Sequence, residues 1–90
     1  PDGTVPETMA EQAATIWATI LNLLAEGEMT ADNVVSVTTY VVADDMDDLP
    51  VVMAARDSAL GGRRAASTLV TVPALAQPAW RMEVAIVATA

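Results

Sequence analysis

Residues 63–90 read RRAASTLVTVPALAQPAWRMEVAIVATA, and this stretch decides the fold of the chain. Residues 66–72 and 80–88 are rich in small and β-branched side chains, which favour pleated strands. Between the two runs, Pro73 and Pro78 have no backbone N–H to donate, so strand pairing is expected to stop there. The connection is too long for a two-residue hairpin. The sequence therefore predicts two final strands with a long linker between them.

Glu83 is the only charged residue between Met82 and the C-terminus. Alternation along a strand places it on one face with Arg81, Ala85 and Val87. Two interpretations stay open at this point. Glu83 is either a functional carboxylate on an apolar strand, or an exposed edge-strand charge paired with Arg81.

The first half of the chain predicts a helix followed by a strand. Thr8 and Glu11 have the spacing of a capping box, and the helix is expected to run to about Glu26, with Gly27 past its end. Its apolar stripe, which is typical of a core and not of a ligand platform, contains Met9, Ala13, Ile16, Trp17, Ile20, Leu23 and Leu24. Residues 34–42, VVSVTTYVV, form the clearest strand. Val35 is expected to share a face with Val37, and Val34 to lie on the other.

A second helix is predicted with Pro50 in its first turn and its end at about Leu60. Four aspartates lie within residues 44–48, and they favour a helix start, with Asp47 or Asp48 as the cap, over a cation site. Gly61-Gly62 ends this helix and lacks the motif of a phosphate-binding loop. The arginines that follow, residues 63 and 64, either line a pocket mouth or are solvated.

The predicted order is helix, strand, helix, strand, strand, which is an α+β fold in a single domain over residues 1–90. Strands joined through a helix are expected to be parallel. Two helices cover one face of such a sheet. The other face also carries apolar residues, so a further layer or another subunit is expected to cover it.

The composition excludes several classes of chemistry. The chain is 53% hydrophobic and has a formal net charge of -8, with four arginines, no lysine, no histidine and no cysteine. Disulfides, a cysteine nucleophile, a Ser-His-Asp triad and the common zinc sites are thereby excluded, and we expect no metal and no cofactor. The acidic surface disfavours nucleic acid. With neither a membrane-length apolar run nor a signal-peptide pattern, a cytoplasmic location is expected.

Several segments in a fixed order resemble a known family. They are residues 32–41 (DNVVSVTTYV), 48–52 (DLPVV), 67–70 (STLV), 72–78 (VPALAQP) and 82–84 (MEV), together with Gln12, Ile16 and Leu24. In this pattern the chain resembles the Rid family, also called the YjgF or endoribonuclease L-PSP family. The resemblance implies a chorismate-mutase-like fold that forms a homotrimer, with the sheets inward and small-molecule pockets between subunits. It also implies hydrolysis of enamines or imines, such as 2-aminoacrylate, to keto acids and ammonia.

The family's site residues carry over only in part. The glutamate that positions water falls on Glu83, whereas the arginine that holds the substrate carboxylate falls on Ala66, next to Ser67. A family asparagine falls on Met53, and a second acidic residue falls on Ala85. Alanine offers no guanidinium, so the usual bidentate clamp is absent.

Arg81 and Arg64 are the candidates to replace that clamp and bind an anionic ligand. Arg81 shares a predicted strand face with Glu83. The family's first β-hairpin has no counterpart in these 90 residues. Either this sequence omits that segment, or processing removed it, or the protein is a short variant.

Two functions follow from the resemblance. The first is enamine or imine hydrolysis with altered activity, in which Glu83 is catalytic and Arg81, Arg64, Ala66 and Ser67 surround a small anionic or imine-type ligand. The alternative is a ligand-binding or structural trimer without catalysis. Ribonuclease activity is disfavoured by the negative charge.

Overall fold

A computed structural model describes residues 5–62 and 65–90. Its main elements are α1 (Met9–Glu26), β1 (Val34–Val42), α2 (Leu49–Ala59), β2 (Ala66–Val72) and β3 (Met82–Ala88). Two short 3₁₀ helices, η1 (Ala31–Asn33) and η2 (Ala43–Asp48), flank β1. The predicted order is confirmed, and so are the bounds of β1 and β2. The final strand begins at Met82, two residues later than predicted.

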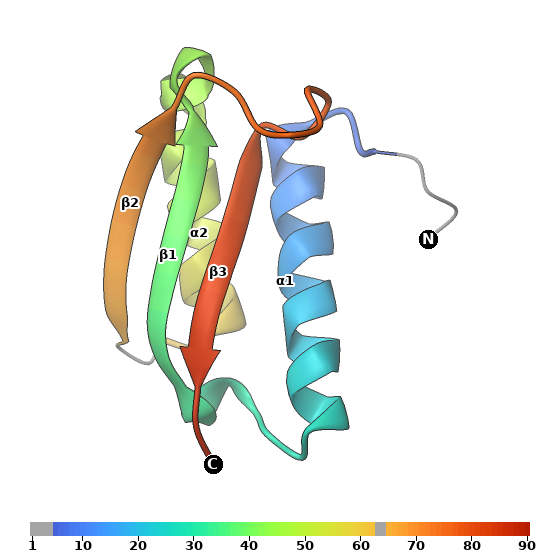
Figure 1. Cartoon of the computed structure of the whole chain (residues 1–90), viewed down its shortest axis with the longest axis vertical. Coiled ribbons are helices and arrows are strands. Elements are labelled where there is room, and N and C mark those ends of the chain that lie inside the picture. The colour runs from blue at the N-terminus through green and yellow to red at the C-terminus, as the bar shows by residue number, and fades with distance from the viewer. Residues whose placement is uncertain (1–4, 63–64) are drawn as a thin grey trace.

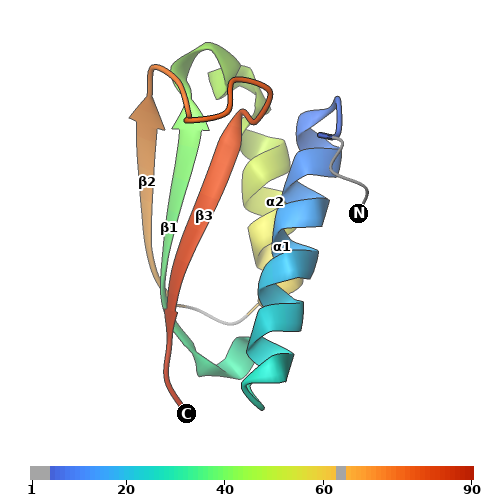
Figure 2. The ribbon, with the colours of Figure 1, turned by 45° about the vertical axis from the view of Figure 1, so that its right-hand side comes forward.

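The three strands form one sheet in the order β2-β1-β3. β1 and β2, which are joined through α2, are parallel as predicted, and β1 and β3 are antiparallel. Both α-helices lie on the same side of the sheet (Figures 1 and 2), so no described helix covers the other side, which is called the open side below. The two-layer α+β fold is confirmed.

The core lies between the helices and the sheet. Val34, Val37 and Val41 of β1 are at most 1% exposed, and they belong to two clusters of buried residues that include Trp17 of α1 and Val52 of α2. Complete burial of an aliphatic side chain stabilises the fold by about 1.5–3 kcal/mol. Packing of this face is thus the main support of the layered structure.

An irregularity in β1 changes which residues face the core. Pairing with β3 shifts between Val34 and Ser36, because Val34 pairs with Ala88 and Ser36 pairs with Val87. Val35 is the extra residue of this bulge and is 44% exposed, whereas Val34 is fully buried. The predicted faces of these two residues were therefore wrong, since a bulge reverses strict alternation.

The ends of the helices agree with the sequence at some positions and differ at others. Thr8 and Glu11 form the predicted capping box at the start of α1. Asp48 occupies the N-cap position of α2, but its side chain makes no capping hydrogen bond, so that part of the prediction was wrong. Gly61 and Gly62 end α2 with positive φ angles of 64° and 79°, which favour glycine, as predicted.

Within the described residues, neither helix has the length and apolar character needed to cross a membrane.

Candidate functional site

Gln12 fixes the point at which the last strand begins. Its side chain is 1% exposed, and its Nε2 donates hydrogen bonds to the backbone oxygens of Pro6 (3.0 Å) and Ala79 (2.9 Å). Its Oε1 accepts a hydrogen bond from the backbone N–H of Arg81 at 2.9 Å. Gln12 thus holds the N–H of Arg81 at the start of the strand, whereas the Arg81 oxygen already accepts a hydrogen bond from the Val42 N–H of β1 at 3.0 Å.

Glu83 follows at the second position of β3 and lies on the open face of the sheet. It is exposed, and its pairing partner on β1 is Tyr40. Directly opposed residues on an antiparallel pair project to the same side, with Cβ atoms about 5 Å apart. In the part of the chain that the structure describes, the Glu83 carboxylate makes no hydrogen bond and no ion pair. It is therefore available to accept hydrogen bonds from water or from a ligand.

A groove of about 740 Å³ runs beside Glu83, between α1 and the outer edge of β3. Apolar side chains from both elements and from the 73–81 linker line it, including Ile16, Leu75, Trp80 and Val84. The linker crosses one end of the groove region between β3 and α1 (Figure 1). Glu83 thus lies where the open face meets an apolar groove.

Arg81 does not pair with Glu83 in this structure. Its guanidinium donates to Asp45 Oδ1 at 3.0 Å and to the backbone oxygen of Glu7 at 2.8 Å, and Asp48 Oδ2 lies 4.0 Å away. The guanidinium therefore connects η2 to the segment before α1. The interpretation of Glu83 as a charge neutralised by Arg81 was wrong.

The other predicted site residues lie away from Glu83 within one chain. Ala66 opposes Ser36 on the open face, whereas Glu83 opposes Tyr40 four residues further along β1. Strand geometry places positions 66 and 83 roughly 16 Å apart. Ser67 projects to the helix side, where its Oγ accepts a hydrogen bond from Arg56. Arg64 lies outside the described residues.

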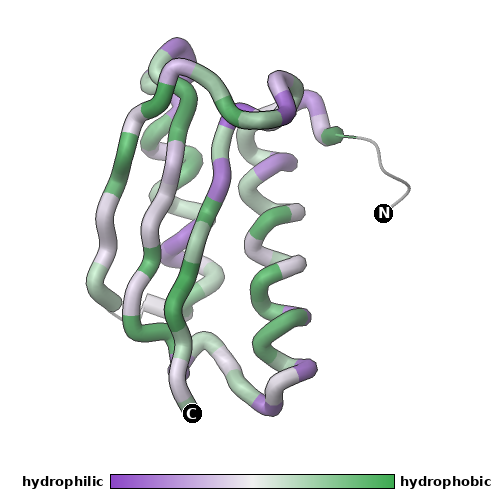
Figure 3. Tube along the Cα trace, in the orientation of Figure 1, coloured by the Kyte–Doolittle hydropathy of each residue, from purple (hydrophilic) through white to green (hydrophobic). Residues whose placement is uncertain are grey.

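Hydropathy varies along the three strands of the sheet. Figure 3 shows hydrophobic segments alternating with paler or hydrophilic ones along the strands, as expected where successive side chains point to opposite faces. Val87 is 58% exposed on that face, two residues after Ala85 and four after Glu83. The open face thus carries both an exposed apolar side chain and, within the described residues, a carboxylate without a partner.

Comparison with known proteins places this arrangement in a family. The sequence pattern described as endoribonuclease L-PSP matches residues 1–90. The chain belongs to this family. Solved structures of the same group include a candidate endoribonuclease L-PSP from Entamoeba histolytica, with a TM-score of 0.86 and 26% identity over 96% of this chain and 66% of that one.

Two further structures connect the endoribonuclease L-PSP family to its other names. A member of the YjgF protein family from Neisseria meningitidis has a TM-score of 0.82 and 34% identity, over 98% of this chain and 71% of that one. A protein of the conserved Rid family from Yersinia pestis has a TM-score of 0.80 and 26% identity, over 92% and 64%. The present family member spans about two thirds of the length of the structures it matches first. No curated protein matches it.

Sequence reasoning missed the structural roles of two polar residues in this family member. In the sequence Gln12 belongs to the family pattern, and its place beside the apolar stripe of α1 is a signal for a buried hydrogen-bonding group. For Arg56, no local pattern predicts that its side chain reaches Ser67. Met53 is half-buried against the core, and Ala85 lies with Glu83 on the open face.

Proposed function

We propose that the protein is a homotrimer that hydrolyses small enamines or imines to carbonyl compounds and ammonia, with Glu83 positioning the attacking water. The observation that supports this most is the free carboxylate of Glu83 on the open, partly apolar face of the sheet. A carboxylate without a partner is able to accept the proton of a water molecule that attacks a carbon–nitrogen double bond, which is a general-base role.

The hydrolysis balances without a cofactor. Water adds to the imine carbon to form a new C–O bond, and its proton passes through Glu83 to the nitrogen. The remaining hydroxyl proton then moves through Glu83 to the nitrogen as the C–N bond breaks, so that one imine and one water give one carbonyl compound and one ammonia. Glu83 is regenerated as a carboxylate.

Strand register supports a site made by more than one copy. Positions 66 and 83 lie on the same open face, but roughly 16 Å apart in one chain by strand geometry. A small ligand spans less than that distance. A pocket that uses both positions therefore requires residues from two copies, with the open faces turned toward each other.

The alanine at position 66 weakens the binding of an anionic substrate. Ala66 supplies no guanidinium, and Arg81 is occupied by Asp45 and Glu7. Losing a buried charge pair of this kind costs about 2–5 kcal/mol in binding. We therefore expect slow turnover of 2-aminoacrylate, and a faster reaction when Ala66 is replaced by Arg.

An assay of keto-acid release from freshly generated 2-aminoacrylate tests the proposal. Glu83→Gln is expected to lower the turnover rate by about 100-fold, the lower range of general-base contributions. Glu28→Gln, which changes an exposed carboxylate elsewhere, is the matched control and is expected to keep full turnover. Full turnover by Glu83→Gln would remove Glu83 from the mechanism.

The second candidate is a trimer that binds a ligand without catalysis. The ion pair of Arg81 and the alanine at position 66 favour it, because both deprive the site of a free cation. If neither the parent nor Ala66→Arg releases keto acid above the uncatalysed rate, this second function holds. Ribonuclease activity, which the family's name suggests, is less compatible with this chain, because its net charge of -8 repels a phosphate backbone.

A further inference from the structure

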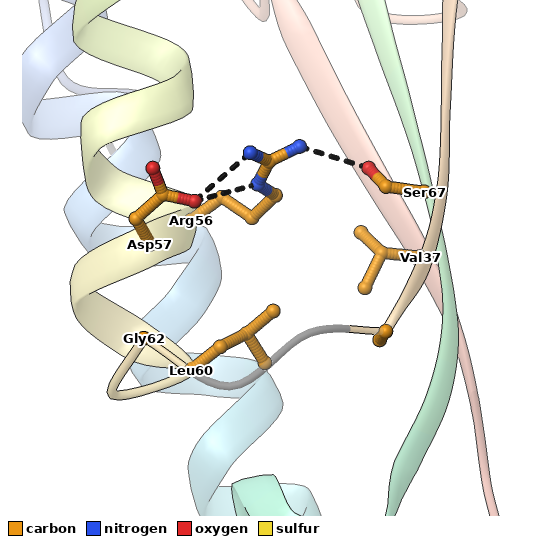
Figure 4. A pocket seen from close by; sticks show the side chains of 7 residues that line it. Val37, Arg56, Asp57, Leu60, Gly62 and Ser67 are labelled. Atoms are coloured by element: carbon orange, nitrogen blue, oxygen red, sulfur yellow. Dashed lines mark hydrogen bonds and ion pairs between the residues drawn. The ribbon is translucent and has the colours of Figure 1, made fainter.

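A second cavity lies on the opposite side of the sheet from Glu83. It is about 480 Å³ in volume and opens between the C-terminal half of α2 and the beginning of β2 (Figure 4). Its walls include Val37, Leu60 and Ala65, of which Val37 is 1% and Leu60 6% exposed. The volume is within the range of natural small-molecule sites.

Arg56 reaches across this cavity from α2 toward β2. Its NH1 donates to Ser67 Oγ at 2.9 Å, and its Nε and NH2 donate to Asp57 Oδ1 at 3.1 and 2.9 Å. A guanidinium has five N–H groups. Two of them, one on each terminal nitrogen, therefore have no partner among the described residues. The Ser67 hydroxyl accepts from Arg56 and keeps its own hydrogen to donate.

The ion pair with Asp57 holds this guanidinium only weakly. Its side chain is 64% exposed, whereas that of Arg56 is 24% exposed. Exposed ion pairs contribute little because water solvates both partners well. An acid that enters the cavity meets the guanidinium where it is partly dehydrated, and Asp57 is free to turn toward solvent. In Figure 4 the guanidinium extends above the side chains of Val37 and Leu60.

We propose that this cavity binds a short aliphatic monocarboxylate. The carboxylate accepts hydrogen bonds from the guanidinium of Arg56 and from the hydroxyl of Ser67, and the hydrocarbon tail contacts Val37, Leu60 and Ala65. Inorganic phosphate suits the cavity less well, because it has no apolar part and its second charge is repelled by Asp57. The site is independent of Glu83, from which the sheet separates it.

Butyrate is the probe for this site. Titration of the isotopically labelled chain in 0.15 M salt is expected to give saturable shifts in the amide signals of Leu60, Ala65 and Ser67 and in the Nε signal of Arg56. Butyramide has the same shape without the charge, and it is expected to bind at least about tenfold more weakly, as is phosphate. Glu83→Gln is expected to leave butyrate binding unchanged.

Three variants separate a binding site from a structural bridge. Arg56→Gln is expected to weaken butyrate binding by about tenfold or more, and Arg56→Lys by less, because lysine keeps the charge but not the fork. Asp57→Asn removes the competing carboxylate and is expected to strengthen binding several-fold.

If Arg56→Gln does not fold, Ser67→Ala takes its place, because it keeps the guanidinium and removes a single hydroxyl; it is expected to bind about threefold to tenfold more weakly. The proposal is overturned if butyrate shows no saturation, if butyramide binds equally well, or if the Arg56 and Ser67 variants that fold bind butyrate as the parent does.

Discussion

Successive side chains of each strand point to opposite faces of the sheet, yet the two faces differ in what covers them. On the helix side, Val34, Val37, Val41 and Met82 are at most 1% exposed. On the open side, Val87 is 58% exposed and Glu83 has no partner among the described residues. Along β1 and at Met82 the helix side is thus covered by contacts within the chain, although Leu69 of β2 on the same side is 40% exposed, whereas no described helix covers the open side.

This difference separates residues that specify the fold from residues that we assign to function. Substitutions on the helix side are expected to change the stability of the chain itself. Substitutions on the open side are expected to change association and turnover. Because assembly makes unfolding depend on concentration, each variant below is compared with the parent at the same chain concentration.

The largest effect is expected for Trp17→Ala. Trp17 is 3% exposed in the core between α1 and the sheet, and its truncation leaves a cavity. We expect a loss of about 3–5 kcal/mol in the free energy of unfolding, measured by chemical denaturation. Val87→Ala on the open face is the comparison variant, and for the dissociated chain its effect is expected within about 0.5 kcal/mol. Equal losses in the two variants would contradict the distinction between the faces.

Gln12→Ala is expected to have the next largest effect. The substitution removes three hydrogen bonds and leaves the backbone groups of Pro6, Ala79 and Arg81 without this partner. We expect a loss of about 2–3 kcal/mol in the free energy of unfolding. Hydrogen exchange is expected to rise first in the linker and at the start of β3. Unchanged protection of the Arg81 amide would show that Gln12 does not set the beginning of the strand.

The smallest effect, and the one of opposite sign, is expected for Thr39→Val. The Thr39 Oγ1 is buried and has no hydrogen-bond partner in the described structure. Replacing the hydroxyl by a methyl group removes an unsatisfied polar atom and is expected to raise the free energy of unfolding by about 1 kcal/mol. Thr38→Val, one residue along on the open face, is the matched control and is expected to gain less. A loss of stability in Thr39→Val would mean that its hydroxyl has a partner in solution.

Much of the fold could be predicted because its signals are local. The capping box at Thr8, the run of residues 34–42 and the glycine pair that ends α2 each depend on neighbours in sequence. Strand alternation also predicted that Glu83 shares a face with Ala85 and Val87, as the register with β1 has it. These features required only the periods of helices and strands and the chemistry of their ends.

The features that sequence reasoning predicted wrongly depend on contacts between distant segments. The bulge that buries Val34 and exposes Val35 arises from pairing with β3, more than fifty residues later in the chain. The partners of Arg81 lie on η2 and before α1, so its proximity to Glu83 in sequence was misleading. Asp48 occupies the N-cap position of α2, but its side chain makes no capping hydrogen bond, and no local pattern indicates this.

The central claim is that copies of this chain cover each other's open faces. Native mass spectrometry tests it most directly, with the parent compared with Val87→Asp and with Val51→Asp, which places the same charge on exposed α2. From a chain of 9.4 kDa, we predict a parent mass of about 28 kDa, a single-chain mass for Val87→Asp and an intact trimer for Val51→Asp. A parent that remains a monomer, or a trimer that tolerates aspartate at position 87, would contradict the account.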